Sequence, residues 1–313
     1  MPRSHTPVRT FIFNIKYKTT YILKRKVKRI IVQLLHLNRT GNYPYISGDG
    51  FRSLAQHIYD ESSDFNPAKV ETGDVVFMNP DFIVAYFRDK HPHIKKKYIL
   101  ITQNSDLGIE EKHTKYIDEK IACWFAKNVL YGHPKIVPTP IGLTNNFLNK
   151  IGTTSDMSEM RSHDLTKKEM KMSYGFSLAS GTERIALKAK LDKNPLAVNV
   201  SEKTQVAYFS KMSNYSFVVS PEGNGADCHR TWEALYLRCV PIAKRNYFIE
   251  QFKEQGLPIL VIDDWKEIET FTEEYLEKCY REMSHRFEND ILFMEYWIAR
   301  IMEEKKKIFT LSH

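Results

Sequence analysis

Strand-like apolar runs and segments of helical period alternate along this chain from about residue 43 onward. Short runs of consecutive apolar residues are typical of strands that are covered on both faces of a parallel sheet. These runs lie at residues 74–78, 98–102, 121–126, 136–140, 171–177, 217–220, 239–243 and 258–262. Helical periodicity lies between them, at residues 51–59, 182–191, after residue 228 and from residue 271 onward. The pattern predicts an α/β fold with parallel sheets.

The length of 313 residues and a polar interval near the middle favour two domains. The interval spans residues 151–170, is rich in Ser, Thr, Met and charged residues, and predicts a linker or an insertion. We therefore expect one α/β domain at residues 43–150 and a second at residues 171–290. Residues 291–313 carry an aromatic stripe at helical spacing, which predicts either core packing or a helix that packs back on the first domain.

The basic charge of the chain is concentrated near its N-terminus. The net charge of +8 comes from 46 basic and 38 acidic residues, and ten of the basic residues precede Asp49, the first acidic one. Without these ten, 36 basic residues face 38 acidic ones, so the body of the chain is close to neutral. This distribution argues against nucleic-acid binding by the protein as a whole, because such binding requires a basic surface.

Residues 1–42 form a basic and apolar arm. Lysines interrupt its apolar runs, so none is long enough to cross a bilayer, and its pattern does not fit a signal peptide. Two interpretations stay open: an amphipathic helix on an anionic membrane surface, or a solvated arm that packs partly on the body. The four cysteines have no CxxC spacing, which indicates a reducing compartment. We expect a cytoplasmic protein, peripheral on the inner membrane face if the arm binds lipid.

The segment 216–243 carries the most specific chemistry. Its pattern predicts a buried strand, a loop with Gly223 and Gly225, a helix, and a second buried strand. The two glycines allow backbone N–H groups to turn toward a ligand, and Asp227 is the predicted N-cap of the helix. His229 and Arg230 then lie in the first helical turn, where positive charge opposes the helix dipole. A bound anion would reverse that cost, so the segment predicts an anion site.

Arg230 and Glu233 are three residues apart and share one face of the predicted helix. A nucleoside diphosphate needs both groups, since a guanidinium binds phosphate oxygens and a carboxylate binds ribose hydroxyls. The alternative is a surface ion pair that only stabilises the helix. The segment lacks the GK[ST] of a Walker loop and the third glycine of a dinucleotide fingerprint. Residues 177–184 and 263–264 also follow strands, so we expect them to converge on the same cleft.

The sequence PEGNGADCHRTWEALYLRCVPI resembles the donor-binding segment of exostosin-like glycosyltransferases of family 47. It is especially similar to the branch with the ribitol xylosyltransferase of animals and related polysaccharide enzymes of bacteria and viruses. The matching residues are Gly223, Gly225, Arg230, Glu233, Cys239, Val240 and Pro241. Arg238 stands where the family has glycine, a departure at the end of the helix. The resemblance covers about thirty residues, and it extends weakly upstream, where Arg184 fits a second phosphate-side position.

The resemblance implies a GT-B architecture, in which two Rossmann-like domains face a cleft. Residues 43–150 would form the acceptor-side domain and residues 171–290 the domain that binds the nucleotide-sugar. The implied donor is a nucleoside-diphosphate sugar, a UDP-sugar in our prediction, carrying a hexosyl or pentosyl group. The donor-binding residues would be Arg184, Gly223, Asn224, Gly225, Asp227, His229, Arg230 and Glu233. No metal and no cofactor is expected, because the helix N-terminus, arginine and histidine would stabilise the leaving diphosphate.

The implied reaction is a direct displacement with inversion at the anomeric carbon, assisted by a general base from the first domain. Asp49, between two glycines before a helix, is the first candidate for the base, with an ordinary N-cap or turn residue as the alternative. Asp106, after the strand at residues 98–102, is the second. The acceptor would be a glycan, a polyol-phosphate or a lipid-linked glycan in the synthesis of a surface polysaccharide or glycoconjugate. A nucleotide- or glycan-binding module without catalysis is the alternative function.

Overall fold

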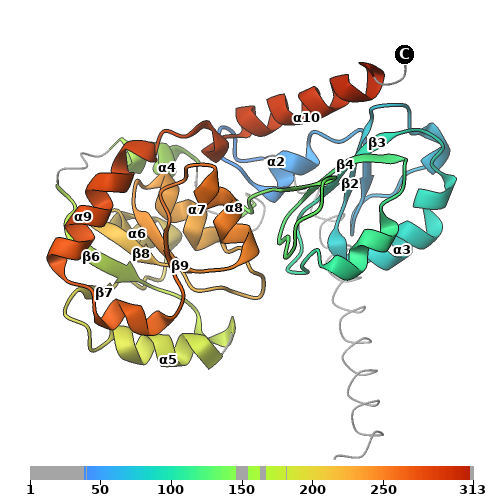
Figure 1. Ribbon diagram of the computed structural model, residues 1–313. Coiled ribbons are helices and arrows are strands. Elements are labelled where there is room, and N and C mark those ends of the chain that lie inside the picture. Colours follow the sequence, from blue (N-terminus) through green and yellow to red (C-terminus); the bar gives the residue numbers. More distant parts are fainter. Residues whose placement is uncertain (1–38, 40, 146–153, 163–166, 181, 311–313) are drawn as a thin grey trace, which may run out of the picture.

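The computed structural model describes residues 39, 41–145, 154–162, 167–180 and 182–310. Two α/β domains lie side by side, the N-terminal one in blue to green and the C-terminal one in yellow to red (Figure 1). The predicted basic arm lies outside the described residues except at residues 39, 41 and 42. Among the described helices, none is long and apolar enough to cross a membrane.

The N-terminal domain is built on a five-stranded parallel sheet in the order β1-β2-β3-β4-β5. Its strands are β1 (His57–Tyr59), β2 (Val75–Met78), β3 (Tyr98–Thr102), β4 (Ile121–Ala126) and β5 (Ile136–Pro138). All residues of β2 and β3 are buried, as the apolar runs predicted. The helix predicted at residues 51–59 is wrong in part, because α2 spans only Gly48–Arg52 and the half-buried edge strand β1 follows it.

The C-terminal domain contains a second parallel sheet in the order β10-β9-β8-β6-β7. Its strands are β6 (Glu169–Tyr174), β7 (Ala197–Asn199), β8 (Tyr215–Val219), β9 (Val240–Lys244) and β10 (Leu260–Ile262). Its helices are α5 (Thr182–Leu191), α6 (Gln205–Met212), α7 (His229–Tyr236), α8 (Tyr247–Glu254) and α9 (Glu273–Met283). Two five-stranded parallel sheets confirm the predicted α/β class with two Rossmann-like domains, the layout of a GT-B fold.

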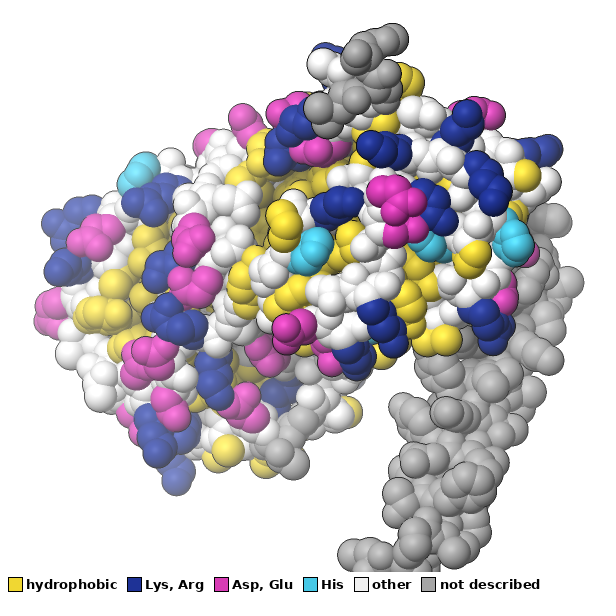
Figure 2. All heavy atoms as spheres, turned by 45° about the vertical axis from the view of Figure 1, so that its right-hand side comes forward, with side chains coloured by type: hydrophobic (Ala, Val, Ile, Leu, Met, Phe, Trp, Pro, Cys, Tyr) yellow, Lys and Arg dark blue, Asp and Glu magenta, His cyan; other side chains and the backbone are white. Residues whose placement is uncertain are grey.

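Three further α-helices complete the described chain: α3 (Ile83–Asp89), α4 (Thr154–Arg161) and α10 (Met294–Thr310). Short 3₁₀ turns lie at Pro67–Lys69, Pro80–Phe82, His91–His93, Glu111–Tyr116, Leu178–Ser180, Trp265–Glu269, Ser284–Arg286 and Asp290–Leu292. On the face drawn in Figure 2, acidic and basic side chains are interspersed, in keeping with the nearly neutral body of the chain.

Helix α10 follows the C-terminal domain and packs on β3 and β4 of the N-terminal sheet (Figure 1). Trp297 of this helix lies edge-on to Phe51, with 5.9 Å between ring centroids, and 6.5 Å from Phe252 of the C-terminal domain. Its indole also donates to the carbonyl of Ile291 at 3.0 Å. The apolar core is therefore continuous between the domains on this side.

Helix α7 ends on a residue in the left-handed backbone conformation. Leu237 is its C-cap, and Arg238 follows with φ of 55°. This is the position at which the resembling family has glycine, the residue that adopts this conformation at least cost. The backbone N–H of Arg238 donates to the carbonyl of Leu235 at 3.1 Å, and its side chain donates to Glu288 at 2.6 Å. The chain thus keeps the helix-end geometry without glycine.

Candidate donor-binding site

A cavity of about 550 Å³ opens at the carboxyl ends of β6 and β8. Its volume lies in the range of small-molecule sites, and its place is where open parallel sheets bind ligands. It is lined by residues 175–177, Arg184, residues 201–205, Tyr208, residues 228–230 and Glu233. Three strand ends were expected to converge on one cleft. Residues of 177–184 and residues 228–230 line the cavity, whereas residues 263–264 do not.

Arg184 lies on α5 and is only 6% exposed. Its guanidinium donates to three backbone carbonyls: Glu222 at 2.8 Å, Ser177 at 3.0 Å and Pro221 at 3.1 Å. The side chain therefore joins the loop after β6 to the loop after β8. Burial and the nearby charge of Arg230 lower its pKa. Both guanidiniums line the same cavity.

Arg230 lies in the first turn of α7. Its Nε donates to the carbonyl of Gly175 at 3.2 Å and to the hydroxyl of Tyr208 at 3.1 Å. The ring of Phe176 lies 5.6 Å from its guanidinium carbon and 5.7 Å from that of Arg184. Contacts through Nε fix the plane of the guanidinium and leave its two terminal nitrogens for an anion.

Glu233 is 7% exposed and lines the same cavity one helical turn after Arg230. Its carboxyl is hydrogen-bonded by the side chain of Gln205. Burial raises the pKa of Glu233 to about 7, although the charge of Arg230 and the hydrogen bond from Gln205 oppose this. The alternative interpretation of a surface ion pair is wrong, because Glu233 is buried and forms no direct ion pair with Arg230.

His229 lies at the boundary between the domains. Its Nδ1 is 2.7 Å from the carbonyl oxygen of Gly142 in the N-terminal domain. Burial, together with the charges of Lys127 and Arg230, lowers the pKa of His229 to about 4, although the bond to Gly142 and the charge of Asp106 oppose this. The ring is therefore neutral at neutral pH, and it lines the cavity beside Arg230.

The glycine loop before α7 faces the N-terminal domain and does not line the cavity. A Cβ on Gly225 would lie 2.5 Å from Nδ2 of the Asn128 side chain, so a larger residue there would displace a side chain of the other domain. Asn224 donates to the carboxylate of Asp106 across the same boundary at 3.2 Å. On Gly223, a Cβ would lie 3.3 Å from Nη2 of Arg184.

Asp227 is not the N-cap of α7, which is Cys228. Its carboxylate accepts hydrogen bonds from the backbone N–H of Ile141 and from Nε1 of Trp232, both at 2.7 Å. It is 4% exposed, and burial raises its pKa to about 7. Asp227 therefore joins the two domains and lies outside the cavity, which argues against its predicted contact with a donor.

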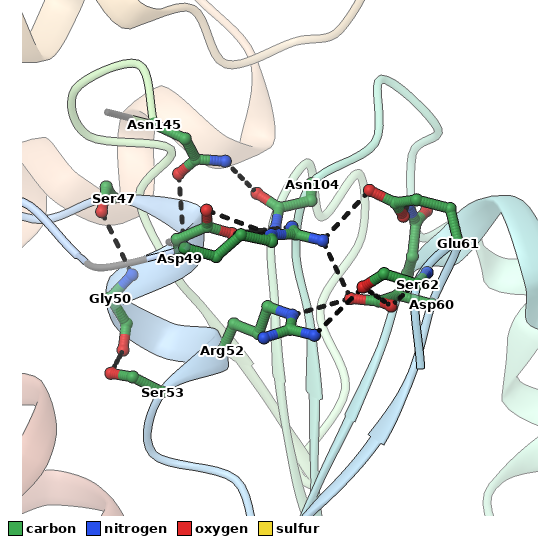
Figure 3. Close-up of polar contacts among 12 residues, drawn as sticks. Ser47, Asp49, Gly50, Arg52, Ser53, Asp60, Glu61, Ser62, Asn104 and Asn145 are labelled. Atoms are coloured by element: carbon green, nitrogen blue, oxygen red, sulfur yellow. Dashed lines mark hydrogen bonds and ion pairs between the residues drawn. The ribbon is translucent and has the colours of Figure 1, made fainter. Parts of the chain in front are cut away.

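Asp49 occupies a buried polar network of the N-terminal domain (Figure 3). It has no exposed surface, and its Oδ1 accepts hydrogen bonds from Arg39 at 2.7 Å and from Asn104 at 2.9 Å. The N-cap of α2 is Ser47 and not Asp49. A general base must reach the acceptor hydroxyl, so this geometry argues against Asp49 as the base and gives it a structural role.

Asp106 is exposed and follows β3, on the side of the N-terminal domain that meets α7. Nearby, Lys127 is 3% exposed at the end of β4. Burial lowers the pKa of Lys127, and the charges of Asp227, Asp106 and Asp81 oppose this. The charge of Lys127 lowers the pKa of His229, and the charge of Asp106 raises it. Charged groups of both domains therefore lie near His229.

Sequence reasoning missed the side chains that complete the cavity from other elements. Tyr208 and Gln205 come from α6, Phe176 from the end of β6, and Lys203 from the loop before α6. A helix of this length was not predicted at residues 205–212, where the apolar spacing of Val206, Phe209 and Met212 was the available signal.

No protein-family model matches the chain, and no curated protein is significantly similar to it in sequence. The exostosin-like assignment therefore stays a prediction. Among solved structures, the chain resembles an α1,3-fucosyltransferase with GDP-fucose, at 12% identity and a TM-score of 0.42 over 78% of this chain and 80% of that one. A second α1,3-fucosyltransferase structure gives 12% identity and a TM-score of 0.43 over 79% and 81%. The GtfA/B complex gives 10% identity and a TM-score of 0.40 over 76% and 58%.

Proposed function

We propose that this chain is a glycosyltransferase that moves a sugar from a nucleoside-diphosphate donor, a UDP-sugar, to a hydroxyl group of an acceptor. One observation carries the proposal. Two guanidiniums and a buried carboxyl line a single cavity of about 550 Å³ at the carboxyl ends of two parallel strands, beside the boundary with a second α/β domain. This combination suits a ligand with a diphosphate, a ribose and a group that projects toward the other domain.

Arg230 and Arg184 would bind the diphosphate. In the part of the chain that the structure describes, neither forms an ion pair with a carboxylate, and Lys203 adds a third cation to the lining. Positive charge fixed in place before the reaction stabilises the charge that develops on a leaving diphosphate. We therefore propose that transfer needs no divalent metal.

Glu233 would bind the ribose hydroxyls. Its carboxyl lies one helical turn from Arg230, and Gln205 supplies a second polar group beside it. Carboxylates accept two hydroxyl hydrogen bonds at once, which is the way in which many nucleotide sites recognise ribose.

In the reaction, an acceptor oxygen attacks the anomeric carbon and the bond from that carbon to the diphosphate oxygen breaks. The bonding electrons go to the diphosphate, and configuration inverts because attack comes from the opposite side. The acceptor would approach from the N-terminal domain. There the exposed carboxylate of Asp106 would accept a hydrogen bond from one of the acceptor's hydroxyl groups. A glycan or polyol-phosphate acceptor, soluble or lipid-linked, fits the proposal, with the basic arm holding the enzyme at a membrane.

A panel of nucleotide-sugars with mass-spectrometric detection of the released nucleotide tests the proposal. We expect one donor to be hydrolysed or transferred, with unchanged rate in EDTA. Arg230→Ala and Glu233→Ala should abolish the activity while unfolding stays cooperative. Arg245→Ala is the matched control, since this exposed arginine pairs with Glu250 and Asp263 outside the cavity. Full activity in both cavity variants would refute the assignment, and nucleotide binding without turnover would favour a non-catalytic binding module.

A further inference from the structure

The hydrogen bond from His229 to Gly142 fixes the tautomer of the imidazole. A backbone carbonyl can only accept, so Nδ1, 2.7 Å from the Gly142 oxygen, carries the proton. In the neutral ring, Nε2 then holds a lone pair and no proton. Within the described residues, Nε2 of His229 has no hydrogen-bond partner, and the side chain lines the donor cavity.

A neutral ring in this tautomer cannot donate a hydrogen bond from Nε2 to a phosphate oxygen. The charged groups that face His229 come from both domains: Lys127 and Arg230 disfavour the imidazolium, and Asp106 favours it. A bound diphosphate would add negative charge beside the ring and favour protonation further. Donor binding would therefore raise the pKa of His229 from its low value in the free protein.

We propose that His229 is the general base, with Nε2 taking the proton of the acceptor hydroxyl. The inference rests on the proposed glycosyl transfer. As the O–H bond of the acceptor breaks, its oxygen forms the new bond to the anomeric carbon, and the old bond to the diphosphate oxygen breaks. The proton ends on Nε2, and the leaving diphosphate carries the electron pair.

Asp106 is the other group that could take this proton, and the geometry favours His229. A base must touch the acceptor oxygen. His229 lines the cavity and is bonded to Gly142 of the N-terminal domain, the side from which the acceptor approaches, whereas Asp106 is not part of the lining. The carboxylate of Asp106 also accepts a hydrogen bond from Asn224 at 3.2 Å. Asp106 is then a positioning residue, whose negative charge stabilises the imidazolium of His229.

His229→Asn is the decisive variant. The amide nitrogen of asparagine lies near the position of Nδ1 and can still donate to the Gly142 carbonyl, but nothing replaces Nε2. We expect UDP to bind this variant within about threefold of the wild type by calorimetry. This variant should hydrolyse the nucleotide-sugar that the wild type cleaves about 10²- to 10⁴-fold more slowly, which is the usual contribution of a general base. The residual rate should also lose the decrease at acid pH that protonation of His229 causes in the wild type.

Three results would overturn the inference. Hydrolysis by His229→Asn within about threefold of the wild type, with a large loss in Asp106→Asn, would make Asp106 the base. Loss of UDP binding in His229→Asn, with the fold intact by circular dichroism, would make His229 a donor-binding residue. Failure of the wild type itself to bind UDP, GDP or CMP would remove the proposed function, and this result is distinct because it does not depend on any variant.

Discussion

The carboxylate of Asp227 accepts a hydrogen bond from the backbone N–H of Ile141 in the other domain, with 2.7 Å between Oδ2 and N. Its second oxygen accepts from Nε1 of Trp232 at the same distance. One side chain thus fixes the start of α7 and the position of the two domains relative to each other.

Asp227→Asn should lower the free energy of unfolding by about 1–3 kcal/mol. The NH₂ group of asparagine is itself a donor, so one of the two buried N–H groups that Asp227 accepts from would lose its acceptor. Urea unfolding measures the change. Glu277→Gln, an exposed substitution of the same chemical kind, is the control and should change stability little. Equal stability of the two variants would show that the bonds of Asp227 contribute nothing net.

Donor affinity should rise with pH as Glu233 ionises. Burial raises the pKa of Glu233 to about 7 in the free protein, so the carboxylate that we propose to bind ribose is the minor form at pH 6. Binding of a UDP-sugar, whose diphosphate charge is constant here, should strengthen by about fivefold to tenfold from pH 6 to pH 8. Calorimetry at the two pH values measures the change. In Glu233→Gln the affinity should be weaker and independent of pH, and a flat profile in the wild type would contradict the role of Glu233.

Alkylation of Cys228 should report on occupancy of the cavity without any need for catalysis. Cys228 lines the cavity and is half-buried, whereas Cys123, Cys239 and Cys279 are buried. Iodoacetamide should therefore label Cys228 first in the folded protein, and saturating UDP should slow the labelling at least about tenfold. Peptide mass spectrometry follows the reaction, with Cys228→Ser as the control. A labelling rate that does not change with UDP would place the nucleotide elsewhere.

Arg39 should be essential for the stability of the N-terminal domain. Its guanidinium contacts Asp49 at 2.7 Å and both Asp60 and Glu61 at 3.1 Å, and all three carboxylates are buried. Arg39→Met leaves these charges with too few partners and should cost about 3–5 kcal/mol in urea unfolding. Arg88→Met, which removes an exposed pair with Asp89, should cost less than about 1 kcal/mol. Similar losses in both variants would contradict this account.

Acid should weaken the same network. Burial opposes ionisation of Asp60, but the hydrogen bond and charge of Arg52 and the charge of Arg39 outweigh it and lower its pKa. A carboxyl whose pKa is lower in the folded state contributes stability that is lost as pH falls through its ordinary value of 3.8 and below. Asp60→Asn should be less stable than the wild type at pH 7, and the difference should narrow toward pH 3.

The strands were predictable from the sequence because both faces of each central strand are covered. Val75 to Met78 and Tyr98 to Thr102 are apolar throughout and buried throughout. Strand β1 was not predictable in this way, since its three residues are half-buried at the sheet edge and lack a continuous apolar run. Propensity could not distinguish it from the end of the short helix before it.

Part of the site was predictable because it lies within one strand–loop–helix segment. His229, Arg230 and Glu233 line one cavity as their spacing in a helix requires. Gln205 and Tyr208 could not be assigned, because α6 comes to lie near α7 only through the connection from β7 past β6 to β8. Asp49 looked like an accessible turn residue, and its burial depends on Arg39, a pairing that no local pattern reveals.

The bond between His229 and Gly142 has a consequence for domain exchange. The C-terminal domain alone does not contain the carbonyl that sets the tautomer of His229, nor the Ile141 amide that Asp227 binds. A chimera that joins this C-terminal domain to a foreign N-terminal domain would retain its arginines and still misplace the base that we propose. We expect functional chimeras only when the segment at residues 141–142 is transplanted together with α7.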